Sequence, residues 1–331
     1  MTGFFVGKLG QYVLVLWVAL TLNFFLPRMM PGNPLALLAG EEVNLLTPAE
    51  RQQLMARVGL DQPLHVQYVA YLQNIVRGDF GYSYQKNKPI TTILLDRLPW
   101  TLVLTGTSLL ISTVLGITLG AMAAWKRGGQ RDVSLLGGFI FLESLPAFWV
   151  GMMLVALFAV QWQLFPTFGA TTPWATMTPD ERALDILHHL ALPLTTLTIV
   201  SISGTFFVAR YSMLAVLGDE YIIVARAKGL QERAVLFRHA LRNALLPIAT
   251  VFTLNLAFAV GGATVVETVF SYPGIGRLTY EAVLNRDYPV LQASFLMITI
   301  VVVAANIVAD AVYPLLDPRV RAGQARGAGG A

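Results

Sequence analysis

The sequence contains no cysteine and few charged residues. Without cysteine, disulfides, thiolate nucleophiles and cysteine metal sites are excluded. Charged side chains make up only 13% of the 331 residues, whereas a soluble domain needs roughly 25% to cover its surface. The formal net charge of +4 is too small for a nucleic-acid-binding chain. With 55% hydrophobic residues and a mean hydropathy of +0.62, the composition predicts an integral membrane protein, and we expect an all-α one.

The sequence motifs of catalytic and nucleotide-binding sites are also missing. There is no G-x-x-x-x-G-K-[ST] phosphate loop, no H-E-x-x-H, no G-x-S-x-G and no G-x-G-x-x-G after a strand. The adjacent His188 and His189 point in different directions on a helix, which disfavours a shared metal ion. We therefore predict that the chain is no enzyme and binds neither a metal nor a cofactor.

Six uncharged runs are long enough to cross a membrane, which takes about 20 mostly apolar residues. The third run is expected to extend back through Glu143 to Ser134 and to leave the membrane near Val160, because prolines mark the rest of it as loop. The first run is longer than the core of a signal peptide and is interpreted as a retained helix. The six runs are Leu9–Leu26, Leu98–Trp125, Ser144–Pro179, Leu190–Ala209, Asn243–Val266 and Tyr288–Ala309.

The lysines and arginines of the short loops set the orientation of the spans. If the N-terminus is cytoplasmic, the inside segments hold 13 basic residues and the short outside segments hold four. The long segment Pro31–Arg97 is left out of this count, because long loops cross the membrane largely regardless of charge. The distribution predicts that both termini lie in the cytoplasm.

The outer segment Pro31–Arg97 is too long for a featureless loop. Thr47, Pro48 and Glu50 have the pattern of a capped helix start. We predict a small helical extracytoplasmic segment, which either seals the ends of the spans or offers a docking surface to an external partner. In the stretch "HVQYVAYLQNIV" a helix would bring the apolar residues close to one stripe, namely Val66, Val69, Tyr71, Leu72 and Ile75.

The segment "VARAKGLQERAVLFRHALRNALLP", Val224–Pro247, contains four arginines, one lysine and a single acidic residue. Gly229 is expected to end a first helix in a left-handed cap. The sequence predicts a helix–glycine–helix elbow on the cytoplasmic face. Its spacing alone leaves open whether the elbow contacts a protein partner or lies on anionic lipid headgroups. The second helix is expected to carry an apolar stripe of Leu230, Ala234, Phe237, Leu241 and Ala244.

This segment resembles the coupling loop of ABC importer permeases, specifically that of the dipeptide/oligopeptide branch. "ARAKGL" followed by "RHALRNALLP" is close to the wording of that branch. The general importer motif has Glu-Ala-Ala where this chain has Ile223, Val224 and Ala225, and Pro247 falls 18 residues after Gly229. Both departures are similar to those of the peptide branch.

The resemblance extends over nearly the whole chain. Further matches, in the same order as in the branch, are "MMPGNP", "GLDQPLHVQYVAYLQNIVRGDFGYSY", "ETVFSYPGIGRL" with "NRDYPVLQ", and "DPRVR". They point to the B-type permease of the pair and imply the type I ABC importer permease fold in a bacterial cytoplasmic membrane. The implied parts are residues 1–30 with the first span, an extracytoplasmic segment 31–97, a five-helix core 98–316 with a coupling segment 219–243, and a cytoplasmic tail 317–331.

The resemblance also implies the partners and the coupling residues. The partners would be a second homologous permease, two cytoplasmic ATPase subunits that use ATP and Mg, an extracytoplasmic solute-binding protein, and the lipid bilayer. The substrate would be a di- or oligopeptide or a related small solute such as glutathione or a nickel complex. The residues that would couple ATP hydrolysis to transport are Ala225, Arg226, Ala227, Lys228, Gly229, Leu230, Glu232 and Arg233.

Polar residues inside the spans are candidates for the translocation path. A carboxylate at the bilayer centre costs about 2.5–3.5 kcal/mol on insertion scales and usually faces protein or water. Glu143 and Asn255 are therefore candidates, with a packing role equally open for each. Gly116 and Gly120 are expected to permit close helix packing. Two alternative functions are an ion-gradient-driven secondary transporter and a non-transporting scaffold, neither of which accounts for the full-chain resemblance.

Overall fold

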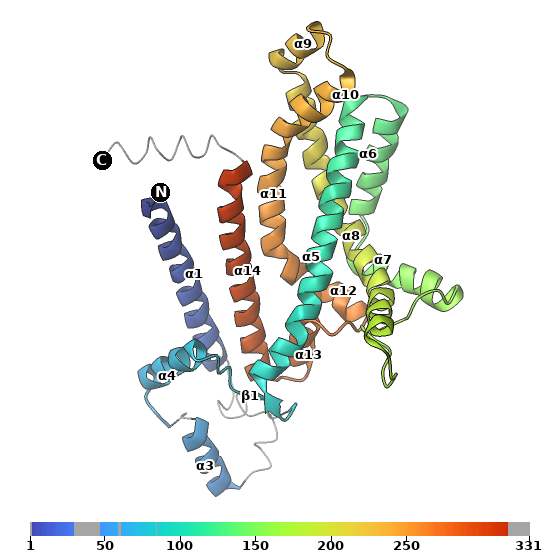
Figure 1. Ribbon diagram of the computed structural model, residues 1–331. Coiled ribbons are helices and arrows are strands. Elements are labelled where there is room, and N and C mark those ends of the chain that lie inside the picture. Colours follow the sequence, from blue (N-terminus) through green and yellow to red (C-terminus); the bar gives the residue numbers. More distant parts are fainter. Residues whose placement is uncertain (1, 30–46, 59–60, 84, 317–331) are drawn as a thin grey trace. The chain divides into compact units, whose positions relative to one another are not determined.

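A computed structural model describes residues 2–29, 47–58, 61–83 and 85–316. The described chain is mainly helical and includes one antiparallel strand pair, β1 (Tyr82–Ser83) with β2 (Lys88–Pro89). It divides into two compact units, whose helices are labelled in Figure 1. Unit 1 comprises Met1–Thr101 and Pro273–Val303, and unit 2 comprises Leu102–Tyr272 and Ala304–Ala331. Two long helices, α5 (Ile90–Trp125) and α14 (Tyr288–Leu316), each contribute to both units.

Unit 1 packs the first part of α5 against α13 (Ile275–Leu284) and the start of α14. The Thr101 hydroxyl accepts the N–H of Ile275 at 2.8 Å and so satisfies an amide at the start of α13. Asp287 caps α14 through the N–H of Val290, at 3.3 Å. The buried core consists of Ile90, Ile93, Leu94, Ile275, Leu278, Ala282, Val290, Ala293 and Met297.

The two predicted helices of the outer segment are present in unit 1 as α3 (Pro48–Val58) and α4 (Leu64–Val76). The predicted capping box at the start of α3 is confirmed. The N–H of Thr47 donates to the Glu50 carboxylate at 2.8 Å, and the N–H of Glu50 donates to the Thr47 hydroxyl at 3.4 Å. These hydrogen bonds lower the pKa of Glu50.

The apolar stripe predicted for α4 is confirmed in part, since Tyr71, Leu72 and Ile75 are half-buried. Val66 and Val69 are 41% and 51% exposed, whereas Tyr68 packs against α1 (Thr2–Met29). The Tyr68 hydroxyl hydrogen-bonds to Thr21 at 2.7 Å, and its ring lies 5.1 Å from that of Phe24. The contacts of Tyr68 therefore help to determine which face of α4 packs against α1. The spacing of apolar residues does not predict these contacts.

Unit 2 is built around α8 (Pro179–Leu217), a helix of 39 residues. The second part of α5 approaches it closely at two glycines. A Cβ at Gly116 would lie 2.8 Å from the Cβ of Thr205, and one at Gly120 would lie 2.7 Å from the Phe206 carbonyl oxygen. This confirms that the two glycines permit close helix packing. The other helices are α6 (Gln130–Glu143), α7 (Ala147–Leu154), η2 (Val155–Gln161), α9 (Glu220–Ala227), α10 (Glu232–Ala234), η3 (Val235–Ala240), α11 (Leu241–Gly262) and α12 (Thr264–Val269).

Four helices are long and apolar enough to cross a membrane: Gly7–Phe25, Ile90–Trp125, Pro179–Leu217 and Tyr288–Asp310. They correspond to the first, second, fourth and sixth predicted spans. Within α11, the described apolar stretch Pro247–Leu256 is shorter than a span. The structure thus supports four spans, or five if α6 and the α7–η2 pair form one.

The predicted third span is not an uninterrupted helix. Its two parts, Gln130–Glu143 and Ala147–Gln161, are bent by 99° at the break. Pro146 is the N-cap residue of α7 with extended backbone angles. Proline has no N–H and disfavours helical angles in the residue before it, which explains why the helix ends near Glu143 and restarts after Pro146.

Candidate functional site in the helix–glycine–helix elbow

The elbow, residues 219–243, contains the predicted glycine turn. Helix α9 ends with the backbone N–H of Gly229 bonded to the Arg226 carbonyl at 2.9 Å, and the N–H of Leu230 bonded to the Ala225 carbonyl at 3.4 Å. Gly229 has φ +76°, as this type of helix end requires. The predicted left-handed cap is confirmed, and an L-residue at this position would cost about 1 kcal/mol or more.

An ion pair closes the turn from the outside. The Nε of Arg226 lies 3.3 Å from the Glu232 carboxylate, across Gly229. The Arg226 guanidinium also lies 5.6 Å from the centre of the Trp125 ring at the end of α5. Because both members of the pair are largely exposed, at 43% and 60%, the pair contributes little to stability.

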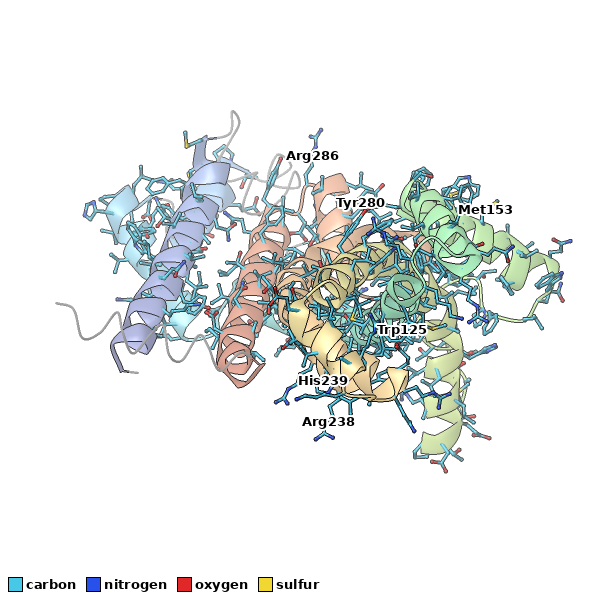
Figure 2. All side chains as sticks on the ribbon, turned by 90° about the horizontal axis from the view of Figure 1, so that it is seen from above. Trp125, Met153, Arg238, His239, Tyr280 and Arg286 are labelled. Carbon is cyan, nitrogen blue, oxygen red and sulfur yellow. The ribbon has the colours of Figure 1, made fainter. Side chains whose placement is uncertain are left out.

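The inner face of the elbow packs on an alanine-rich cluster. Ala225 is 6% exposed and is therefore a packing residue that faces inward. Trp125 packs against the same cluster (Figure 2). Small side chains let α5, α8, α9 and α11 approach one another closely, so the elbow and these helices share one core. The cluster consists of Ala121, Ala124, Met213, Ile222, Ala225, Val235, Ala240 and Ala244.

The outer face of the elbow carries the other predicted coupling residues. Arg226, Ala227, Lys228, Gly229, Leu230, Glu232 and Arg233 are all exposed. Further along, Arg238 points away from the helix that carries it (Figure 2). These residues form a basic, accessible surface on one side of a packed turn.

The apolar stripe predicted for the second helix is wrong in part. Phe237 is 63% exposed and Leu230 is 41% exposed, whereas Val235 and Ala240 are fully buried. Leu230 precedes the start of α10, and Phe237 belongs to Val235–Ala240, which is a π-helix. A π-helix has i→i+5 hydrogen bonds and a wider turn, so residues spaced three and four apart no longer share one face. Such turns are frequent at functional sites.

A buried ion pair, which the sequence analysis missed, lies beside the elbow in unit 2. Arg210 of α8 holds Asp132 of α6 with Nε–Oδ1 at 2.7 Å and Nη2–Oδ2 at 2.8 Å. The N–H of Gly128 donates to the same carboxylate at 2.9 Å. Both side chains are buried, with Arg210 8% and Asp132 3% exposed. We call this ion pair the brace, because it fastens α6 to α8 one turn before Met213, which belongs to the core of the elbow.

The brace could not be read from the sequence, because its residues are 78 positions apart. The available signal was weak: each residue is a charge at the edge of an apolar run. The pair is bidentate and has an additional backbone donor, which is the arrangement that compensates the desolvation of a buried carboxylate.

The two path candidates lie elsewhere in unit 2. Glu143 is the last residue of α6, directly before the break, and its side chain is exposed. Asn255 lies on α11 and is half-buried. Their role in a translocation path stays a prediction.

The two adjacent histidines have different partners, as their directions on a helix predict. His188 Nε2 lies 2.8 Å from the Leu164 carbonyl oxygen, and His189 Nδ1 lies 2.9 Å from the Asp185 carbonyl oxygen. In the described ranges, no group of three or more histidine, aspartate or glutamate side chains is arranged to hold a metal ion.

Two family models match this chain. The model described as "binding-protein-dependent transport system inner membrane component" matches residues 116–322, which include the whole elbow. The model for the N-terminal part of the membrane component of binding-protein-dependent transport systems matches residues 1–105.

Individual proteins are similar over nearly the full length. The oligopeptide transport system permease protein AppB of Bacillus subtilis is 36% identical over 300 residues, which are 90% of this chain and 93% of that protein. The dipeptide transport system permease protein DppB of Escherichia coli is 35% identical over 339 residues, with 97% and 99% covered. An inward-facing structure of the MetNI methionine ABC transporter has a TM-score of 0.55 at 16% identity, covering 68% of this chain and 96% of that one, and this likeness shows the fold.

Proposed function

Because this chain belongs to the family of binding-protein-dependent transport system inner membrane components, we propose that it is the membrane-spanning permease subunit of an ATP-driven importer for di- or oligopeptides or a related small solute. The two similar permeases named above act on oligopeptides and dipeptides, according to their names. Multi-pass insertion in a bacterial inner membrane follows from the family and from the apolar helices.

The observation that carries the proposal is the two-sided construction of the elbow. Its outer face offers Arg226, Lys228 and Arg233 to a partner, and its inner face shares one core with α5, α8 and α11. A close-packed core transmits displacement rather than absorbing it. A partner that moves the elbow therefore moves these helices with it.

The division of labour follows from the family. Two ATPase subunits would bind ATP and Mg and move the elbow through Ala227, Lys228, Gly229, Leu230 and the flanking charged residues. A second permease would complete the path, and an extracytoplasmic binding protein would deliver the solute. The distribution of lysine and arginine supports this orientation, with the elbow and both termini in the cytoplasm and the segment 31–97 outside.

The break between α6 and α7 supports Glu143 as a residue of the path. Backbone irregularities at membrane depth are tolerated only where they are buried in protein or line a water-filled cavity. Glu143 is the residue next to this break. Asn255 is proposed as a second polar contact on the path.

The decisive experiment measures ATP hydrolysis and solute uptake by the same reconstituted importer. We expect Gly229→Val to leave the complex assembled and ATP hydrolysis present while uptake is lost, because valine cannot hold φ +76° without strain. Gly229→Asn is the matched variant, since asparagine tolerates the left-handed region, and it should retain uptake.

Gly169→Val is the control for backbone strain. Gly169 also has a positive φ, at +87°, but lies outside the elbow, so its substitution should leave the ratio of uptake to hydrolysis unchanged. Unchanged uptake in Gly229→Val would reject the coupling role of the elbow. Uptake that persists without any ATPase subunit would reject the importer itself and favour an ion-gradient-driven transporter.

A further inference from the structure

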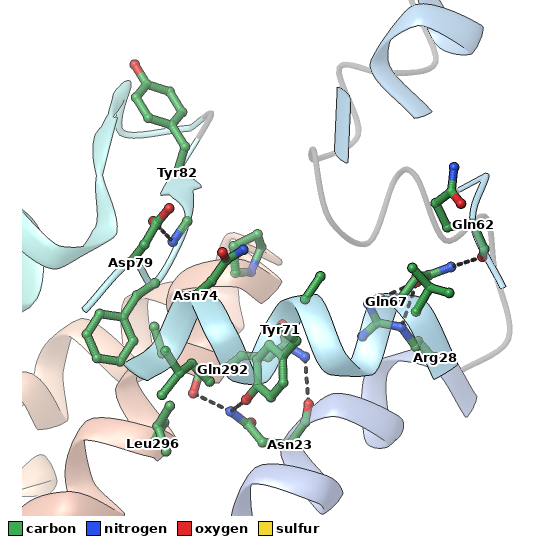
Figure 3. Close-up of a pocket in the computed structure, with 17 residues that line it drawn as sticks. Asn23, Arg28, Gln62, Gln67, Tyr71, Asn74, Asp79, Tyr82, Gln292 and Leu296 are labelled. Carbon is green, nitrogen blue, oxygen red and sulfur yellow. Dashed lines mark hydrogen bonds between the residues drawn. The ribbon is translucent and has the colours of Figure 1, made fainter. Parts of the chain in front are cut away.

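Unit 1 contains a cavity of about 390 Å³ beside α4 (Figure 3). This volume lies in the range of small-molecule sites, roughly 300–1,000 Å³. The walls come from α1, α4, the segment before and within β1, and the start of α14. Among the lining residues are Asn23, Arg28, Tyr71, Asn74, Asp79 and Gln292.

The floor of the cavity consists of polar groups from three helices that hydrogen-bond to one another. The Asn23 side chain donates to the Gln292 backbone carbonyl at 2.8 Å, and the Gln292 side chain donates to the Asn23 carbonyl at 2.7 Å. Asn23 also donates to the Tyr71 hydroxyl at 3.3 Å. Three helices that are far apart in sequence thus meet here through satisfied polar groups, so the cavity is preformed.

Arg28 forms one end of the cavity. It donates to the Phe24 carbonyl at 2.8 Å and to the Gln67 side-chain oxygen at 3.3 and 3.4 Å, and its guanidinium carbon lies 3.7 Å from the centre of the buried Phe24 ring. All of these described partners are uncharged. Burial lowers the pKa of Arg28, which means that the site disfavours its positive charge. An anion brought to Arg28 would compensate this cost.

Asp79 forms the opposite end. Helix α4 ends in a glycine turn at Gly78, with φ +77°, and the N–H of Asp79 bonds back to the Asn74 carbonyl at 2.9 Å. Asp79 lines the cavity and is exposed, with its carboxylate beside the backbone that follows it (Figure 3). One carboxylate oxygen accepts the N–H of Gly81 at 2.9 Å, and the described part of the chain supplies no cation to it.

The spacing of the two ends follows from their contacts with α4. The Gln67 side chain accepts from the Arg28 guanidinium, and the Asn74 carbonyl accepts the backbone N–H of Asp79. These two residues of α4 are seven positions apart, which is about 10 Å along an α-helix. A ligand with an anionic and a cationic end at that spacing matches both. An extended peptide advances about 3.3–3.6 Å per residue, so three residues span the distance. The two-carbon link of a phosphatidylethanolamine headgroup is too short to reach both ends.

We propose that this cavity binds a short peptide of about three residues, with its carboxylate at Arg28 and its ammonium group at Asp79. The choice of a peptide rests on the proposed function, whereas the charge pattern and the length come from the cavity itself. The site belongs to the predicted extracytoplasmic side, where an importer meets its substrate. None of its lining residues belongs to the elbow, and neither Glu143 nor Asn255 is among them.

Tri-alanine is the probe for the first test. The importer complex, without its binding protein and without ATP, is placed in phosphatidylcholine nanodiscs, and binding is measured by calorimetry. N-acetylation or C-amidation of tri-alanine removes one end charge, and each should weaken binding about tenfold or more, as expected for a hydrogen bond to a charged group. These peptides require no change in the protein, so misfolding of a variant does not affect the result.

Two variants assign the ends of the peptide. Arg28→Gln should weaken tri-alanine binding about tenfold but should not weaken binding of the amidated peptide further. Asp79→Asn should show the same pattern with the acetylated peptide. Arg77→Gln and Asp61→Asn are the matched controls, because both residues are exposed charges outside the lining of the cavity, and they should leave the affinity unchanged.

Three results would overturn the proposal: no binding of tri-alanine to the unmodified complex, equal affinity for free and blocked peptides, or an affinity in either cavity variant that equals that of the unmodified complex. Stabilisation of the complex by phosphatidylethanolamine, without tri-alanine binding, would instead assign the cavity to lipid. Because ATP-driven uptake is measured separately in the same complex, intact uptake with any of these results would leave the proposed function standing.

Discussion

Two helix ends in this protein have the same backbone and different surroundings. Helix α4 ends at Gly78, and helix α9 ends at Gly229, with φ values of +77° and +76°. In both, the glycine N–H bonds three residues back and the next N–H bonds five residues back. The residue after the glycine is Asp79 in the first turn and Leu230 in the second. The two turns thus share one backbone geometry, and the side chains around each turn determine its function.

The surroundings of the two turns differ in how they are held. The α4 turn lies beside a cavity whose floor is joined by hydrogen bonds between α1, α4 and α14. The α9 turn lies on a cluster of small apolar side chains from several helices. A cavity lined by polar groups is suited to binding a ligand, whereas a close-packed apolar core is suited to transmitting movement. The predictions below test this contrast.

Disruption of the brace should give the largest loss of stability. It should affect the α9 turn and leave the cavity beside the α4 turn unchanged. Removal of one partner of a buried ion pair costs about 3–5 kcal/mol, so Asp132→Asn or Arg210→Gln should lower the free energy of unfolding by about that amount. The measurement is thermal unfolding of the detergent-solubilised permease. An Asp132→Leu/Arg210→Met double variant should recover much of the loss, because apolar replacement of both charges is often neutral or better.

Tri-alanine binding shows whether the loss of the brace has a local effect or disturbs the whole protein. Complex that remains folded in Asp132→Asn should bind tri-alanine with unchanged affinity, since Asp132 does not line the cavity. If the single variants were as stable as the unmodified protein, the brace would contribute nothing measurable. The proposed support of the elbow by α6 would then be wrong.

Substitution of Gly78 and of Gly229 should cost the same amount of stability but impair different functions. Gly78→Ala and Gly229→Ala each place a Cβ in a left-handed conformation, which costs about 1–2 kcal/mol, and no atom beyond the two neighbouring residues lies within 4 Å of either added Cβ. We expect similar shifts in unfolding temperature. Gly229→Ala should lower the ratio of uptake to ATP hydrolysis, whereas Gly78→Ala should weaken tri-alanine binding by displacing Asp79. The same phenotype from both substitutions would remove the contrast between the two turns.

The parts that the sequence predicted correctly depend on short-range patterns. The capping box of Thr47 and Glu50 spans four residues, and the turn at Gly229 depends on one residue that accepts a positive φ. Four of the six predicted spans are also confirmed as long apolar helices, because hydropathy is a property of each segment by itself. Short motifs and the lengths of the apolar runs therefore predict most of the secondary structure and the position of the elbow.

The parts that the sequence did not predict depend on contacts between distant segments or on irregular helix geometry. The brace joins residues 78 positions apart, and no local pattern pairs Asp132 with Arg210. The π-helix Val235–Ala240 changes which residues are buried, and a constant helical period cannot represent that change. The 99° bend near Pro146 has a local cause, but proline within an apolar run also occurs inside uninterrupted helices, as Pro193 does in α8.

The ion pair across the Gly229 turn should give the smallest effect on stability. Its test distinguishes a role in stabilising the turn from a role of Arg226 in contacting a partner. Arg226 and Glu232 are 43% and 60% exposed, so screening by solvent limits the pair to about 0.2–1 kcal/mol. Glu232→Gln should therefore leave the unfolding temperature almost unchanged, at low salt and at high salt. If Arg226 is held in place mainly for a partner, Glu232→Gln should still reduce the ratio of uptake to hydrolysis. The exchanged pair Arg226→Glu/Glu232→Arg restores the bridge but not the basic contact surface, so it should not restore coupling. Full coupling in the exchanged variant would show that the bridge, and not the charge of Arg226 itself, is what the elbow requires.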